Sequence, residues 1–89
     1  MKKKKSISKN ILTFSVIFEP ADEGGYVVSV PSLPGCQTQG ETFEEAVRMV
    51  KDAIKGYVAV MNEQKQEVPK EKADIIVTKV SITNPLSYI

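Results

Sequence analysis

The amino-acid sequence predicts a single α+β domain with the element order β-β-β-α-β, in which a mixed sheet carries one helix on one of its faces. Three observations lead to this prediction. Apolar residues alternate with a period of two in the first third of the chain, an amphipathic run follows a capping sequence, and a segment rich in β-branched residues comes last. With 89 residues the chain has room for one hydrophobic core.

Two strands and a hairpin loop are predicted first. Residues 11–18 alternate in the way expected when one strand face is buried more fully than the other. Residues 19–25 contain proline, aspartate and a glycine pair, which is the composition of a turn. Residues 26–30 alternate again as far as Pro31, whose missing N–H suits the end of a strand.

A tight corner and a short third strand are predicted next. Pro34 and Gly35 fit the two central positions of a type II turn, because proline sets the first φ and glycine accepts the positive second one. The chain then leaves the corner as a strand over residues 36–39, which Gly40 closes.

A capping box predicts that the helix begins at about Phe43. In this pattern the side chains of Thr42 and Glu45 each satisfy a backbone N–H at the start of the helix. Apolar positions recur at helical spacing from Ala46 to Met61, so one helix face is expected to be core. Gly56 lies inside this helix, either to allow a close backbone approach or as a tolerated defect.

The β-branched residues 75–82 predict a fourth strand. A right-handed crossover through the helix would place it parallel to the first strand and beside it. The domain is therefore expected to span residues 11–82, between a basic leader at residues 1–10 and an apolar tail at residues 83–89.

Composition places the chain among soluble globular proteins, with 26% charged and 42% hydrophobic residues. The net charge of +1 hides an asymmetry, because five of the twelve basic residues lie in the leader and the other seven stand against eleven acidic residues. An acidic body suits a basic protein partner better than the phosphates of a nucleic acid. The leader is interpreted as a solvated tail, with an arm for nucleic acid or anionic lipid as the alternative. The sequence contains neither a secretory signal nor a membrane-length apolar stretch, so a cytoplasmic protein is expected.

The residue types offer little for catalysis. The sequence contains no histidine, which is the commonest general acid–base and transition-metal ligand. Cys36 is the single cysteine, and because no base is available to activate its thiol we expect a small packed hydrophobe and not a nucleophile. The pair Gly24-Gly25 lacks the surrounding pattern of a phosphate-binding loop. No enzymatic activity, cofactor or metal ion is expected.

The run from Gly24 to Ala46 resembles the HicB-like antitoxin family. There, a glycine pair, an aromatic residue and alternating apolar residues precede Pro-x-Leu-Pro-Gly-Cys, a Thr-Gln-Gly segment and a helix opening with Glu-Glu-Ala, and each element is present here. The resemblance covers roughly residues 12–82 and implies a partial RNase H-like fold. The residues expected to be structural or to contact a partner are Gly25, Tyr26, Pro31, Leu33, Pro34, Gly35, Cys36 and Gly40, together with the cap residues Thr42 and Glu45.

This resemblance implies an antitoxin of a type II toxin–antitoxin system that binds and blocks a HicA-type toxin, a small basic RNA-cleaving protein. Many family members continue into a DNA-binding domain, whereas this sequence ends at Ile89, so direct DNA binding is not expected. The alternative is a stand-alone oligomer of the same fold that binds a small ligand or RNA without a toxin. A third interpretation is a degenerate RNase H-like nuclease. Residues 11–18 contain no carboxylate that could hold the metal ions of such an enzyme, which disfavours this interpretation.

A surplus of apolar strand residues predicts a homodimer or a higher even-numbered oligomer. If one sheet face packs against the helix, alternation sends a second apolar set to the opposite face, and nothing else in the chain can cover it. The residues assigned to the helix-facing side are Leu12, Phe14, Val16, Phe18, Tyr26, Val28, Val30, Ile76, Val80 and Ile82. The predicted dimer face contains Ile11, Ile17, Val27, Ile75 and Val77, with Leu86, Tyr88 and Ile89 of the tail expected to dock on the neighbour.

Overall fold

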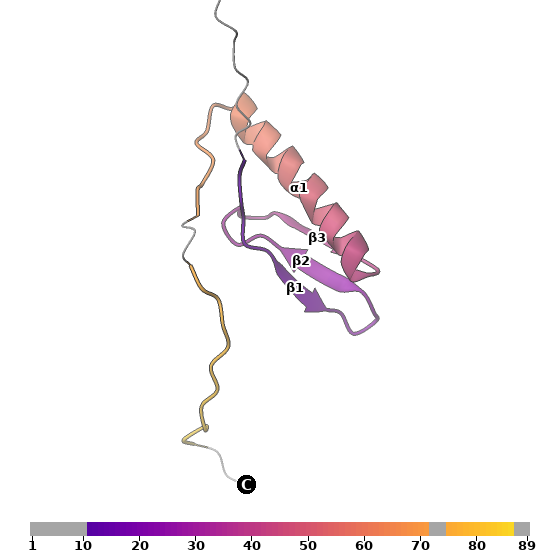
Figure 1. Ribbon diagram of the computed structural model, residues 1–89, viewed down its shortest axis with the longest axis vertical. Helices are drawn as coiled ribbons and strands as arrows, with labels where there is room; N and C mark the ends of the chain where they lie inside the picture. Colours follow the sequence, from indigo (N-terminus) through magenta and orange to yellow (C-terminus); the bar gives the residue numbers. More distant parts are fainter. Residues whose placement is uncertain (1–10, 72–74, 87–89) are drawn as a thin grey trace, which may run out of the picture.

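The computed structural model describes residues 11–71 and 75–86 and contains one small sheet and one helix. The elements are β1 (Ile17–Pro20), β2 (Tyr26–Ser29), β3 (Gln37–Gly40) and α1 (Phe43–Glu63). The strands form an antiparallel sheet in the order β1-β2-β3, and α1 crosses one of its faces (Figure 1). The predicted α+β domain of three antiparallel strands followed by one helix is thus confirmed, while the leader at residues 1–10 and the tail residues 87–89 lie outside the described residues.

The register of the sheet brings one end of all three strands together. Pro20 at the end of β1 pairs with Tyr26 at the start of β2, and Tyr26 pairs with Gly40 at the end of β3. Since α1 begins at Phe43, directly after β3, the hairpin loop and the helix N-terminus lie at this same end of the sheet. The corner between β2 and β3 lies at the other end.

The corner forms as the turn chemistry predicts. The Cys36 N–H donates to the Leu33 carbonyl at 2.9 Å, and Gly35 between them has φ +81°, as the third position of a type II turn requires. The Val30 N–H in turn donates to the Cys36 carbonyl at 3.1 Å, which closes the loop. The Tyr57 hydroxyl donates to the Pro34 carbonyl at 2.7 Å and attaches the corner to α1.

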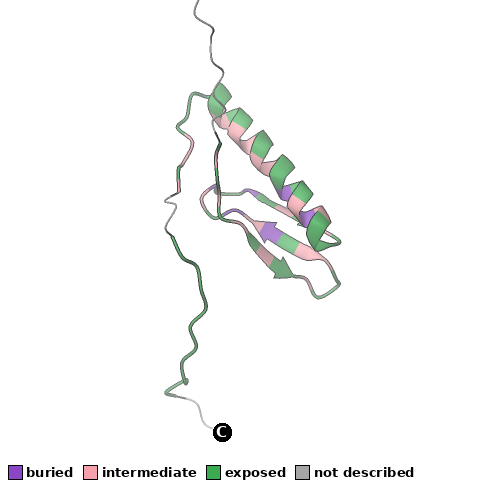
Figure 2. Ribbon diagram, viewed as in Figure 1, coloured by how far each residue is buried: buried purple, intermediate pink, exposed green. Residues whose placement is uncertain are grey.

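A compact core lies between α1, the sheet and the corner, where the buried segments gather in Figure 2. Val28 and Leu33 have no exposed surface, and partly buried Phe14, Val16 and Phe18 pack against this core, so the alternation predicted for the sheet holds. The buried residues are Val28, Val30, Leu33, Cys36, Ala46 and Val50. Ile17 and Val27 occupy the alternate strand positions, on the opposite face of the sheet, and their side chains are 44% and 39% exposed.

Gly40 sets the distance between α1 and the sheet. A Cβ atom built on Gly40 would lie 2.5 Å from the backbone nitrogen of Ala46 and 2.6 Å from its Cα. Real Cβ atoms do not come this close to a backbone, so only glycine permits the contact. The opposing residue is Ala46, a small side chain with no exposed surface.

The first strand is shorter than predicted. Residues 11–16 are extended but belong to no strand ladder, and β1 begins only at Ile17. The reason lies in the partner strand, because β2 ends at Ser29 and the chain turns away at the corner. Two further steps of the register would set Ser15 opposite Pro31, which has no N–H to donate.

The prediction of a fourth strand over residues 75–82 is wrong. Residues 75–82 are extended and exposed, and none of them belongs to a strand (Figures 1 and 2). Ile76, Val80 and Ile82 were assigned to the helix-facing side of the sheet, but they are 85%, 83% and 82% exposed. A β-branched sequence favours extended backbone, yet it forms a strand only where a neighbouring edge accepts its hydrogen bonds.

Glu71 attaches the segment after α1 to the domain. Its carboxylate accepts hydrogen bonds from the Ser15 N–H at 2.9 Å, the Ser15 hydroxyl at 2.7 Å and the Ser32 hydroxyl at 2.7 Å. It thereby takes the place that a longer β2 would have filled beside Ser15. These hydrogen bonds lower the pKa of the Glu71 carboxyl, with the Ser15 side chain contributing most.

Replacing Gly35 and Gly56 by alanine tests the corner with a matched pair. Both positions have open space around an added Cβ, but only Gly35 has a positive φ. We expect Gly35→Ala to destabilise the protein by about 1 kcal/mol through backbone strain, and Gly56→Ala, inside α1, to stabilise it by about 0.5–1 kcal/mol. Urea unfolding measures both, and a stabilising Gly35→Ala would contradict the turn assignment.

Replacing Glu71 by glutamine tests its attachment through pH. A folded-state pKa below the unfolded value means that the carboxylate stabilises the fold above the unfolded pKa, about 4.3 for glutamate, and that this stabilisation is lost as pH falls through the folded pKa. We expect Glu71→Gln to lower the thermal midpoint at pH 7, and the difference from wild type to shrink as the pH falls below the unfolded-state pKa. Glu67→Gln, a nearby exposed carboxylate, is the control and should leave the midpoint unchanged at both pH values.

Candidate functional site

The sheet and the start of α1 carry negative charge only. Residues 11–47 contain six carboxylates and neither lysine nor arginine. The strand register collects all six at the end of the sheet where β1 finishes and α1 begins. We call this region the acidic end, and its members are Glu19, Asp22, Glu23, Glu41, Glu44 and Glu45.

A groove opens at the acidic end between the hairpin loop and the first turns of α1. It has a volume of about 460 Å³ and three carboxylates on its walls, those of Glu23, Glu41 and Glu45. Tyr26 and Met49 add apolar surface to the same groove. Its remaining lining residues are Ala21, Gly24, Val27, Gln39 and Gly40.

The helix cap fixes one wall of this groove. The Thr42 hydroxyl accepts a hydrogen bond from the Glu45 N–H at 3.0 Å, so Thr42 is the N-cap of α1. The Glu45 carboxylate accepts from the Glu41 N–H at 2.6 Å, one residue earlier than in a standard capping box. The cap therefore holds the Glu45 carboxylate at the groove and leaves the Glu41 and Glu44 side chains exposed.

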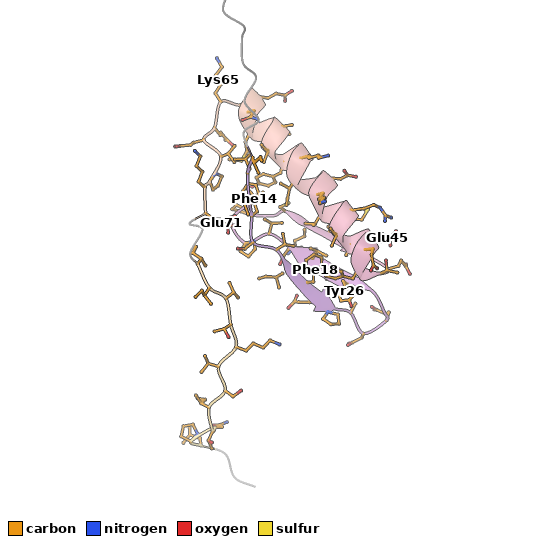
Figure 3. All side chains as sticks on the ribbon, in the orientation of Figure 1. Phe14, Phe18, Tyr26, Glu45, Lys65 and Glu71 are labelled. Carbon is orange, nitrogen blue, oxygen red and sulfur yellow. The ribbon has the colours of Figure 1, made fainter. Side chains whose placement is uncertain are left out.

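Aromatic rings pack beside the acidic end. The ring centroid of Phe43 lies 4.8 Å from that of Phe18 and 5.9 Å from that of Tyr26, the latter pair in an edge-to-face arrangement. Phe18, Tyr26 and Glu45 are labelled together at this end in Figure 3. Tyr26 packs against the core and also lines the groove.

The structure divides the predicted motif between the two ends of the domain. Tyr26, Gly40 and Glu45 line the groove, and Gly25 lies beside Gly40, with an added Cβ only 2.5 Å from the Gly40 carbonyl oxygen. The remaining motif residues form the corner at the opposite end, and these are Pro31, Leu33, Pro34, Gly35 and Cys36. The cap residue Thr42 lies next to the groove.

Cys36 is a core residue of the corner. Its side chain is buried and its thiol is free. Burial raises the pKa of the Cys36 thiol, which keeps it protonated at neutral pH and weakens it as a nucleophile.

The described residues contain neither a cluster of metal ligands nor a membrane-spanning helix. Among residues 11–71 and 75–86, no group of three or more His, Cys, Asp or Glu side chains could hold a metal ion. No helix in the same part of the chain has the length and apolar character needed to cross a bilayer.

Sequence reasoning missed Glu23, Glu41 and Met49 as groove residues. The signal for the two carboxylates was present, because the uninterrupted absence of lysine and arginine from residues 11–47 marks this region as acidic. Met49 could not be assigned in this way, since its place beside the groove depends on how α1 is rotated on the sheet.

Comparison with known proteins gives consistent matches. Residues 14–83 match the sequence model of the family described as HicB_like antitoxin of bacterial toxin-antitoxin system. A UPF0150 protein of Synechocystis is 42% identical over 83% of this chain and 91% of its own length, and a UPF0150 protein of Thermoplasma acidophilum is 38% identical over 73% and 94%. Antitoxin HicB 1 of Photorhabdus laumondii is 41% identical over 71% of this chain and 40% of its own length.

Substitution of Glu45 and Glu44 by alanine tests the cap that shapes the groove. Both changes remove one carboxylate from the first turn of α1, where a negative charge is favourable. Only Glu45→Ala also removes the hydrogen bond to the Glu41 N–H, so we expect it to cost about 1 kcal/mol more than Glu44→Ala. Equal unfolding free energies in urea for the two variants would contradict the cap geometry.

Proposed function

The chain belongs to the HicB-like antitoxin family of bacterial toxin–antitoxin systems, and from this premise we propose that it binds and blocks a HicA-type toxin. Such a toxin is a small basic RNA-cleaving protein, so the antitoxin acts by occupying the toxin surface that would bind RNA. The family indicates a regulatory role without catalysis. The complex forms in the cytoplasm, where the toxin meets its RNA substrate.

The acidic end is the observation that carries this proposal. Six carboxylates gather there without a lysine or arginine in residues 11–47, and α1 carries Arg48 and Lys51 only beyond its first turn. A surface of one sign raises the rate of encounter with a partner of opposite sign and disfavours partners of the same sign. A nucleic-acid backbone would be repelled by this surface, whereas a basic toxin would be attracted to it.

The groove offers a contact for one basic side chain of the toxin. Carboxylates of Glu23 and Glu41 stand on its walls with the capped Glu45 between sheet and helix, so an incoming guanidinium or ammonium group meets acceptors from two sides. The aliphatic stem of that arginine or lysine would lie against Tyr26 and Met49. A toxin whose RNA-binding basic residues are held in this way cannot bind its substrate.

Inhibition and charge reversal test the proposal. The chain should suppress RNA cleavage by the toxin from its own operon at a ratio of about one to one, and complex formation should slow as salt rises. Glu23→Lys/Glu41→Lys should weaken binding by roughly tenfold or more, because it places like charges against the toxin. Titration calorimetry and an RNA-cleavage assay measure the two effects.

The control is Glu63→Lys/Glu67→Lys, which changes net charge by the same amount at the last residue of α1 and in the segment just after it. It should retain binding within a few-fold of wild type. Equal losses from both pairs would mean that net charge and not the acidic end governs recognition. Absence of inhibition with the operon's own toxin would overturn the antitoxin role and favour a stand-alone oligomer.

A further inference from the structure

The outer edge of β1 carries backbone groups that point away from the sheet. The Ala21 N–H donates to the Gly25 carbonyl across the hairpin at 2.9 Å, so odd-numbered residues of this strand direct their backbone groups toward β2. Even-numbered residues, including Val16 and Phe18, direct theirs outward. An edge of this kind is a template for the addition of a further strand.

An apolar groove lies beside the extended run that leads into β1. Leu12 and Phe14, in the extended run that precedes β1, form one side, and the second half of α1 forms the other through Ile54 and Val58. The groove has a volume of about 450 Å³, and its remaining lining residues are Lys55, Ala59 and Asn62. A strand added at the edge would present alternate side chains to this groove.

Residues 75–82 have the pattern that such a strand requires. They extend away from the domain in Figure 1, and every residue is exposed. Ile76, Val80 and Ile82 share one side of the segment, and the only charge in it is Lys79 on the other side. Six of the eight residues are Ile, Val or Thr, which pack well on a pleated surface.

The chain cannot lay this whole segment along its own edge while Glu71 stays bound. The Glu71 carboxylate accepts hydrogen bonds from both Ser15 and Ser32, so it lies on the side of the first strand that faces β2 and the corner. The outer edge of β1 is on the opposite side. If residue 71 is level with Ser15 and the chain continues as a strand parallel to β1, then Ile76 is level with Pro20. Pro20 is the last residue of β1. The rest of the segment would run past the sheet.

We propose that residues 75–82 pair with the β1 edge of a second copy of this chain and fill that copy's apolar groove with Ile76, Val80 and Ile82. Each copy carries one edge and one segment, so a two-fold axis forms two identical contacts at once. The fourth strand predicted from the sequence is then supplied by the partner.

Strand exchange also enlarges the second apolar face. Alternation carries Ile75 and Val77 to the outer side of the partner's sheet, where Ile17 and Val27 are already exposed. The apolar face predicted for dimerisation is therefore completed by residues of both copies. The added strand lies along β1, and the groove at the acidic end is lined by other residues, so that groove stays accessible to a toxin.

Adjacent lysine substitutions test the exchange. Val80→Lys places a charge on the side of the segment that enters the groove, and Ser81→Lys places the same charge on the opposite side. We expect light scattering across a dilution series to show a dimer for wild type and Ser81→Lys, and a dimer dissociation constant raised at least tenfold for Val80→Lys. A strictly monomeric wild type, or equal behaviour of the two variants, would overturn the proposal.

A mixing experiment separates exchange between copies from docking within one chain. Ala59→Lys puts a charge in the groove at an exposed helix position and leaves the segment intact. Alone, Ala59→Lys and Val80→Lys each lack any intact contact and should be monomers that keep the far-UV circular dichroism of wild type. Mixed, they restore one of the two contacts, so a heterodimer should form. No heterodimer on mixing would show that the segment does not exchange.

Discussion

The contact between Gly40 and Ala46 is the constraint on which the rest of the fold depends. The helix backbone passes so close to the end of β3 that a single Cβ atom on Gly40 would collide with it. Because α1 starts this close to the sheet, the small core of Val28, Leu33 and Val50 is enough to fill the space between them. The same contact determines where the helix N-terminus lies, and with it the groove at the acidic end.

The two ends of the sheet have different roles, one in folding and the other in the proposed binding of a toxin. At the corner, backbone hydrogen bonds, the positive φ of Gly35 and the Tyr57 hydroxyl hold a turn that buries Leu33 and Cys36 in the core. At the acidic end, the strand register and the helix cap collect carboxylates around an open groove. The family motif spans both ends, so part of it serves folding and part of it faces the proposed toxin.

Glu71 connects the domain to the segment that follows it. Three hydrogen bonds hold its carboxylate beside Ser15 and Ser32, at the position where β2 has already turned away. This contact orders the chain after α1 without extending the sheet. Among the described residues, the β1 edge and the β-branched residues 75–82 have no strand partner, and this is the ground for proposing a second copy as the occupant.

Local sequence was sufficient for the elements that local chemistry dictates. The residues by themselves determined the order of three strands and a helix, the start of α1 after Thr42, and the turn that needs a glycine at position 35, since caps and turns depend on neighbours within a few residues. The tertiary structure alone decided that residues 11–16 and 75–82 stay outside the sheet and that Glu23, Glu41 and Met49 share a groove with Tyr26. Strand pairing and grooves join residues that are distant along the chain, and periodicity reveals which side of an element is apolar but not which edge or neighbour it meets.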